Sequence, residues 1–128
     1  MSFIEIHRKN CEIVSEEVTV GDVAHMLASS EARVLCVTRG IQIVGYISDK
    51  EMAERASALG REFRRLQAKH VMVGPPITID WKPRAIDIRN TVTLMRRVRA
   101  STAVVTRETT PIGVVSVDML QVHYTVGA

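Results

Sequence analysis

Aromatic residues, cysteines and long hydrophobic runs are all scarce in this chain of 128 residues, which has one Trp, two Tyr, two Phe and two Cys. Two cysteines are too few for the disulfide scaffold of a small secreted domain. We therefore expect Cys11 and Cys36, each next to apolar residues in a strand-like run, to be buried thiols in a reducing compartment, by default the cytoplasm. No apolar run approaches the roughly 18 residues of a membrane span, and the N-terminus shows no export signal.

Catalytic and metal-binding patterns are missing as well. The four histidines do not fall at His-x-x-x-His spacing and the cysteines do not form Cys-x-x-Cys, so no metal site is expected. No Gly-rich phosphate loop precedes a helix, and no Gly-x-Ser-x-Gly elbow is present. The sequence therefore predicts no enzyme and no required cofactor.

The net charge of +3 is unevenly divided along the chain. Residues 1–64 carry 8 basic and 10 acidic groups, whereas residues 65–128 carry 9 basic and 4 acidic groups. A basic half invites a nucleic-acid interpretation, and Arg89 and Arg96 would lie on one helix face. Few aromatic residues and no helix-turn-helix spacing argue against it, so nucleic-acid binding is the least favoured alternative. A solvated face, a phosphate contact and an acidic partner surface all remain open.

One part of the sequence recurs at a constant offset of 68 residues. Residues 34–39 (VLCVTR) match residues 102–107 (TAVVTR), and residues 44–48 (VGYIS) match residues 112–116 (IGVVS). Val, Thr, Arg, Gly and Ser align without a gap, and the positions between them stay apolar. A duplication is the simplest cause, and such self-similarity organises the whole fold.

Each copy predicts the same order of elements. A short β-branched segment, at Ile13–Val14 or at Ile77–Ile79, precedes a helix; in the first copy Thr19 is the expected N-cap and Val20 to Leu27 have helical spacing. Two β-branched strands follow, and a helix closes each copy. The strands are expected at residues 34–38 and 42–48, and at residues 102–106 and 112–116.

The helix that closes the first copy is predicted to be the longest element, spanning Asp49–Gln67. Its apolar positions from Met52 to Leu66 recur every three or four residues, although Gly60 weakens its middle. The segment Val73-Gly74-Pro75-Pro76 cannot continue a helix and starts the second copy in an extended form.

The predicted fold class is α/β (α+β), with two β-α-β-β-α repeats at residues 8–68 and 69–122 packed about a pseudo-two-fold axis. A unit of about 50 residues is too small to bury its own core. We therefore expect the two repeats to share one core and to leave two related clefts between them, where ligands would bind.

The repeated pattern resembles the CBS domain, named after cystathionine β-synthase. The residues that carry the resemblance are Val37-Thr38-Arg39, then Val44-Gly45-Tyr46-Ile47-Ser48-Asp49-Lys50-Glu51-Met52, and finally Val71-Met72-Val73-Gly74-Pro75-Pro76, which looks like the start of a second repeat. The resemblance covers about residues 8–122 and is to a tandem pair, or Bateman module. It implies a dimer of modules that senses an adenosyl ligand such as AMP, ADP, ATP or S-adenosylmethionine.

The resemblance also implies which residues bind that ligand. Ser48 would meet a phosphate and Glu51 the ribose hydroxyls, which suits a hydroxyl donor and a carboxylate acceptor. Ser116 is the equivalent serine, but Met119 replaces the acid, and Asp118 lies one residue earlier, a turn of about 100° on a helix. Strand residues expected near the adenine, chiefly through their backbone groups, are Ile13, Val14, Val34, Thr78 and Thr102.

Other interpretations of these residues stay open. Ser48 and Ser116 either cap the helices that follow or also touch a ligand, and an acid in a first helical turn suits the helix dipole in any case. Trp81 either contacts a partner or packs locally, the commoner outcome. The leading hypothesis is a homodimeric regulatory module that responds to an adenosyl ligand and is read by an effector protein. The alternative, favoured by Met119, is a constitutive dimerisation or protein-interaction module without ligand.

Overall fold

The structure, a computed structural model, describes residues 11–29 and 34–127. The chain divides into two compact units: Asn10–Pro76, called the first unit below, and a second unit that begins at Ile77. In the sequence, the boundary between the two units therefore follows the Pro-Pro pair. The sequence repeats expected at residues 8–68 and 69–122 remain a prediction, and residues 8–10 of the first repeat lie outside the described residues.

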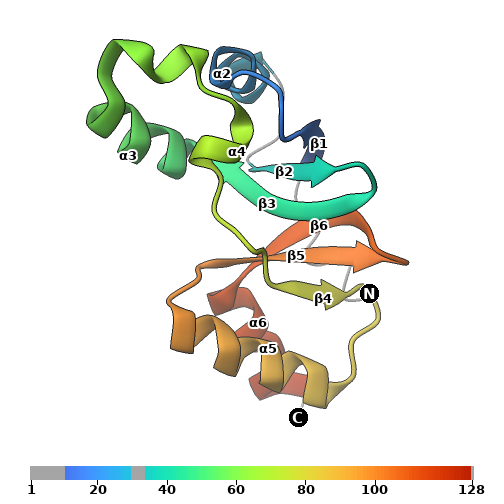
Figure 1. Cartoon of the computed structure of the whole chain (residues 1–128). Coiled ribbons are helices and arrows are strands. Elements are labelled where there is room, and N and C mark those ends of the chain that lie inside the picture. The colour runs from blue at the N-terminus through green and yellow to red at the C-terminus, as the bar shows by residue number, and fades with distance from the viewer. Residues whose placement is uncertain (1–10, 30–33, 128) are drawn as a thin grey trace. The chain divides into compact units, whose positions relative to one another are not determined.

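The first unit contains a three-stranded sheet in the order β1-β2-β3. Strand β1 (Cys11–Ser15) runs parallel to β2 (Val34–Arg39), and β2 is antiparallel to β3 (Gln42–Ser48). Figure 1 shows the helices of the unit on one face of this sheet. They are α2 (Val20–Ser29), α3 (Asp49–Leu59), a 3-10 helix (Gly60–Arg65) and α4 (Ala68–Val71).

The second unit repeats this plan with fewer helices. Its sheet has the order β4-β5-β6, with β4 parallel to β5 and β5 antiparallel to β6. Two helices, α5 and α6, cover one face of the sheet (Figure 1). The elements are β4 (Thr78–Asp80), α5 (Ala85–Val98), β5 (Thr102–Arg107), β6 (Thr110–Ser116) and α6 (Val117–Gly127). Two α/β units with three-stranded sheets confirm the predicted fold class.

The strand pairing of the two hairpins repeats with the same 68-residue offset as the sequence. The first hairpin begins with Val34 opposite Ser48, and the second begins with Thr102 opposite Ser116. Each register then shifts at the same place, because one extra residue, Val44 or its equivalent Ile112, enters the outer strand as a β-bulge. A repeated bulge is difficult to explain by chance and supports the duplication.

Each unit has its own apolar cluster between sheet and helices. In the first unit, alternate strand residues point into the cluster together with one stripe of α2, as expected for half-buried strands and an amphipathic helix. The buried members are Val14, Leu35, Val37 and Ile47 from the strands, Val20, Val23 and Leu27 from α2, and Phe63, Ala68 and Val71. The second unit uses Ile79, Ala103, Val105 and Val115 with Ile88, Val92, Met95 and Leu120.

The predicted long helix Asp49–Gln67 is wrong in its second half. Helix α3 ends at Leu59, a 3-10 helix begins at Gly60, and the short helix α4 follows. Gly60 carries a helix-breaking cost of about 1 kcal/mol relative to alanine, and the chain must turn there to bring Phe63 into the core, where it is buried. Three of the apolar residues that this helix was expected to bury, Met52, Phe63 and Leu66, still pack in the cluster.

Gly45 has no side chain, and this lets the segment after α4 run beside β3. The N–H of Tyr46 donates to the carbonyl of Val73 at 3.0 Å, and the N–H of Val73 donates back at 2.9 Å. A Cβ at Gly45 would lie 2.8 Å from the Val73 carbonyl oxygen and 2.6 Å from Met72 Sδ. This contact pairs the otherwise free edge of β3, a strand edge that would be open to other chains.

The arginine that closes each repeated strand has a different partner in each unit. In the first unit Arg39 donates to both carboxylate oxygens of Glu16, at 2.8 and 3.1 Å. In the second unit the equivalent Arg107 lies over Trp81, 4.7 Å from the ring centroid, and Lys82 lies 4.3 Å from it. Glu16 and Trp81 are equivalent in position, because each donates its N–H to the second-last residue of the neighbouring strand, at 2.9 and 2.8 Å. A salt bridge in one unit thus corresponds to a cation–π contact in the other.

Three sequence expectations are settled by these elements. Thr19 caps α2, since its Oγ1 accepts from the Asp22 N–H at 3.3 Å. Trp81 packs against the core of the second unit, which is the local-packing alternative. In the described ranges no helix has the length and hydropathy to cross a bilayer.

Gly45→Ala should destabilise the protein by about 1 to 3 kcal/mol, the usual range for overpacking, because the new methyl group meets a backbone oxygen that cannot move alone. Gly21→Ala is the matched control. A Cβ there has no neighbour closer than 3.6 Å, so the change should raise helix stability by up to about 1 kcal/mol. Urea unfolding measures both; a neutral Gly45→Ala would contradict the close approach.

Glu16→Gln should lower the thermal midpoint at pH 7 but not at pH 3. The Arg39 guanidinium holds the pKa of Glu16 below its ordinary value, so the folded state binds a proton less readily than the unfolded chain. The ion pair therefore stabilises the fold above about pH 4.3, the ordinary glutamate pKa, and is lost as pH falls through the lowered folded value. Melting curves of the wild type and of Glu16→Gln over a series of pH values check this prediction. A difference in thermal midpoint that stays the same from pH 7 to pH 3 would refute it.

Candidate functional site

Three of the expected ligand residues of the first unit, Ile13, Val34 and Ser48, lie on the sheet face turned away from the unit's own helices. Side chains alternate along a strand, so the residues between the core positions form this second face, called the far face below. Its residues are Cys11 and Ile13 on β1, Val34 and Cys36 on β2, and Tyr46 and Ser48 on β3. Cys11, Val34 and Ser48 form one cross-strand row, and Ile13, Cys36 and Tyr46 form the next.

Ser48 and Glu51 are bonded to each other at the end of β3. The Ser48 N–H donates to Glu51 Oε2 at 2.9 Å, and the Ser48 hydroxyl donates to the same oxygen. Ser48 directly precedes α3 and Glu51 is its third residue, which is the arrangement of half a capping box. Glu51 is only 8% exposed, so this carboxylate is held in a defined place with Oε1 not used in these two bonds.

Tyr46 brings a second polar group to the same end of the far face. It is 5% exposed, and burial raises the pKa of its phenol, with the negative charge of Glu51 adding to the effect. Tyr46 is not among the site residues expected from the sequence. Alternation along β3 would have found it, since residues 46 and 48 share a face and Ser48 was already a candidate.

The other expected site residues of the first unit differ in their solvent exposure and in the sheet face on which they lie. Ile13 is 49% exposed, whereas Val34 is buried on the far face. Val14 points the other way, into the core cluster. Its side chain is therefore unable to reach a ligand on the far face, and only its backbone is left for that purpose.

The second unit has the equivalent cross-strand pair of candidates but lacks the acid. Thr102 lies opposite Ser116, as Val34 lies opposite Ser48, and Thr78 stands opposite Val104. The Ser116 hydroxyl accepts from the Met119 N–H at 3.2 Å, so it caps α6. Asp118 is exposed on the second residue of α6. The capping interpretation is confirmed for Ser116, and no carboxylate occupies the place that Glu51 has in the first unit.

The two cysteines do not have the equal burial expected of them. Cys36 is fully buried, but Cys11 is partly exposed, which corrects the prediction of two buried thiols. Position explains the difference, because Cys11 begins the edge strand β1 whereas Cys36 lies in the central strand β2. Their side chains interact across the far face.

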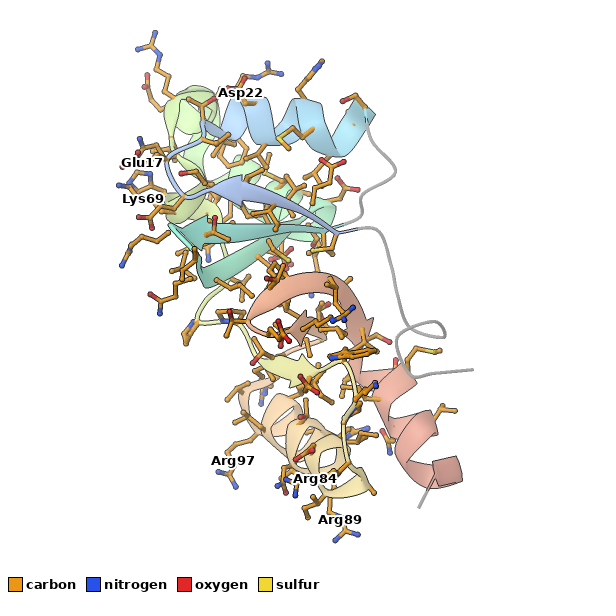
Figure 2. All side chains as sticks on the ribbon, turned by 90° about the vertical axis from the view of Figure 1, so that its right-hand side faces the viewer. Glu17, Asp22, Lys69, Arg84, Arg89 and Arg97 are labelled. Carbon is orange, nitrogen blue, oxygen red and sulfur yellow. The ribbon has the colours of Figure 1, made fainter. Side chains whose placement is uncertain are left out.

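The other ionisable groups of the described residues do not form a comparable site. Among the described residues there is no group of three or more His, Cys, Asp or Glu that could hold a metal ion. Arg84, the residue that precedes α5, and Arg89 and Arg97 on α5 project from the second unit (Figure 2). Arg84 is already engaged, since its guanidinium donates to both carboxylate oxygens of Asp87 at 3.1 and 3.2 Å. That ion pair weakens the case for a purely cationic surface.

The first part of the chain matches a known protein family. Residues 4–58 match the model of the CBS domain. The resemblance to CBS-domain proteins that the sequence suggested is therefore confirmed. No curated protein sequence is similar enough to the chain to count as a match.

Solved structures extend the likeness to nearly the whole chain. A CBS-domain containing protein from Agrobacterium tumefaciens is 12% identical, with 93% of each chain covered and a TM-score of 0.71. A CBS domain protein from Pyrobaculum aerophilum, complexed with AMP, is 18% identical over 98% of this chain and 99% of that chain, with a TM-score of 0.71. The hexameric CBS-CP12 protein from bloom-forming cyanobacteria is 18% identical over 95% of this chain and 71% of that chain, with a TM-score of 0.74. At these identities the likeness establishes the fold alone.

Proposed function

Because residues 4–58 carry a CBS domain and the chain has the fold of CBS-domain proteins, we propose that it is a regulatory module that binds an adenosyl ligand, AMP in the first instance. The observation that carries the proposal is the buried Glu51 carboxylate bonded to Ser48 at the far-face end of β3. The AMP complex of the Pyrobaculum protein supports the choice of ligand.

The chemistry of this pair suits a ribose and a phosphate. A carboxylate accepts hydrogen bonds at both oxygens, so Glu51 Oε1 takes a ribose hydroxyl while Oε2 keeps the bond from the Ser48 N–H. The Ser48 hydroxyl, which donates to Glu51 here, rotates to donate to a second acceptor such as a phosphate oxygen. The carboxylate and the phosphate are both charged acceptors, so the hydroxyl keeps a charge-assisted hydrogen bond when it changes partner.

The two units would then differ in binding. The second unit has Met119 where the first has Glu51, so it offers no carboxylate there to accept from ribose hydroxyls, and its Ser116 hydroxyl oxygen accepts from the Met119 N–H. We therefore infer that each chain binds one adenosyl ligand, at the first unit. Ligand binding changes the population of chain conformations only to the extent of its preference for one of them, and an effector protein reads that change.

Titration calorimetry with AMP tests the proposal. We expect one site per chain with micromolar affinity, and at least a tenfold loss in Ser48→Ala/Glu51→Gln, equal to about 1.4 kcal/mol. Ser116→Ala/Asp118→Asn is the matched control, because it removes the equivalent serine and acid from the second unit. It should leave the affinity unchanged.

Folding must be checked beside the binding, since loss of an N-cap costs about 0.5 to 2 kcal/mol in stability. Circular dichroism and a melting curve of each variant show whether the site is still built. No heat with AMP, ATP or S-adenosylmethionine at concentrations that detect tens of micromolar affinity would rule out the ligand function. Equal losses in the two double variants would rule out the first unit as the single site.

A second candidate function, assembly through the second unit, is favoured by a specific surface. Among the side chains that the structure describes, five apolar ones are exposed on α5 and α6, two helices that pack on each other. They are Ile86, Leu94 and Val98 on α5 with Met119 and Val122 on α6. We propose that a second copy of the chain covers them in a homodimer, because exposed apolar surface of this kind marks association sites in soluble proteins. This role does not require the Ser48–Glu51 pair.

Leu94→Glu should convert the dimer to a monomer of 14.2 kDa in size-exclusion chromatography with light scattering. Leu94 is 44% exposed, so the change should not disturb the fold but places a charge on the surface to be buried. Ile41→Glu is the control, since Ile41 is 92% exposed on the turn of the first unit's hairpin. A wild-type monomer, or an equal effect of both variants, would refute assembly through α5 and α6.

A further inference from the structure

Two cations of the second unit share one aromatic ring. Lys82 Nζ lies 4.3 Å from the centroid of the Trp81 ring, and Arg107 Cζ lies 4.7 Å from it. Trp81 itself is held in place, because its N–H donates to the Thr106 carbonyl at 2.8 Å and its side chain packs against the core cluster. Lys82 and Arg107 are both exposed. The ring is therefore a fixed platform that presents two positive charges to solvent.

Neither cation has a carboxylate partner among the described residues. The acid nearest to Lys82 in sequence is Asp80, whose Oδ2 accepts from the backbone N–H of Lys82 at 3.1 Å. The acid next to Arg107 is Glu108, which is exposed in the hairpin turn. In the part of the chain that the structure describes, neither acid forms a salt bridge. An aromatic ring attracts cations but carries no net charge, so the two positive charges repel each other.

The first unit has an internal counter-charge at the equivalent place. Arg39, the residue equivalent to Arg107, donates to both carboxylate oxygens of Glu16, at 2.8 and 3.1 Å. Glu16 has the position that Trp81 has in the second unit. A guanidinium carries five N–H donors in a planar fork that fits a carboxylate or a phosphate. The fork of Arg39 is occupied by Glu16, whereas the fork of Arg107 makes no hydrogen bond to a described residue.

We propose that Lys82 and Arg107, positioned by Trp81, form a binding site for a phosphate group. Such a group carries a charge of about −1.5 to −2 at pH 7 and has three strong acceptor oxygens, which matches two cations with unused donors. Arg107 binds it through two parallel N–H···O bonds, and Lys82 adds a second positive charge. Because the ring already holds both side chains, less side-chain freedom is lost on binding.

This phosphate site is separate from the adenosyl site proposed above. Its residues all belong to the second unit, and none of them belongs to the Ser48–Glu51 pair. A carboxylate offers one negative charge and two oxygens, so an unphosphorylated acidic group binds more weakly than a phosphate. The phosphate comes either as a free small anion or on a phosphorylated side chain of another protein. Both present the same oxygens to Arg107, and the experiment below separates them.

The fluorescence of Trp81 reports on this site directly, because Trp81 is the only tryptophan in the chain. Inorganic phosphate and a short phosphoserine peptide are titrated separately at constant ionic strength, since surface charges are screened by salt. We expect a saturable change in emission with both probes, and none with the same peptide carrying unmodified serine. A response that does not saturate, or an equal response to the unmodified peptide, would overturn the proposal.

The ratio of the two affinities identifies the source of the phosphate group. A phosphoserine peptide that binds at least tenfold more tightly than inorganic phosphate indicates a phosphorylated partner protein, because the peptide then makes contacts beyond the phosphate itself. Equal affinities indicate a free anion. Either result supports the phosphate chemistry of the site.

Arg107→Gln removes the guanidinium fork and should weaken phosphate binding at least tenfold, equal to about 1.4 kcal/mol. Arg107→Lys keeps the charge but not the fork, and should recover only part of the loss. Arg39→Gln is the matched control, because it removes the equivalent arginine, whose fork Glu16 already occupies. It should leave the affinity unchanged. Since these changes at position 107 alter the starting fluorescence of Trp81, phosphorus NMR measures the binding in parallel.

Two further results would overturn the assignment. Equal losses in Arg39→Gln and Arg107→Gln would show a general effect of charge, and undiminished binding in Arg107→Gln would place the phosphate elsewhere. Because AMP also carries a phosphate, Ser48→Ala/Glu51→Gln is titrated with inorganic phosphate and should keep the wild-type affinity, whereas a loss there would assign the phosphate to the first unit. Failure of the wild type to bind AMP would remove the adenosyl function and leave this test intact. Circular dichroism checks that each variant is folded.

Discussion

The antiparallel hairpin of each unit is the constraint on which the rest of the structure depends. Its register sets Val34 against Ser48 in one unit and Thr102 against Ser116 in the other, with a bulge at the same step in both. A shift of one residue would move every side chain of the shifted strand to the opposite face of the sheet. Because the register holds, one face packs on helices and the other keeps a row of small and polar side chains that ends at the start of the next helix.

Duplication preserved this backbone plan while the side chains attached to it diverged. A salt bridge between Arg39 and Glu16 stands where the second unit has Arg107 and Lys82 around Trp81. A buried carboxylate follows Ser48, whereas methionine follows Ser116 at the same distance. Backbone hydrogen bonds tolerate such replacements, since they do not depend on which side chain is present. One fold can therefore serve the two different roles that we propose, ligand binding for the first unit and association for the second.

The far face of the first unit concentrates the polar chemistry of the described chain. Ser48, Glu51 and Tyr46 lie at one end, and the Cys11 and Cys36 thiols lie across the neighbouring strands. The low exposure of Glu51 and Tyr46 strengthens the interactions among these groups, because little water remains to screen them.

The sequence by itself determined the repeat, the order of elements in each copy and the selection of Ser48, Glu51, Ser116 and Met119. These features follow from local patterns: alternation along strands, turn residues, and a hydroxyl before a helix. Only the tertiary structure decided that the helix after β3 ends at Leu59, that Val14 faces the core, that Cys11 is partly exposed and that Tyr46 joins the site. Each of these depends on which neighbour covers a residue. Local patterns specify which side of a strand or helix a residue occupies, but burial and contact arise only when distant segments pack together.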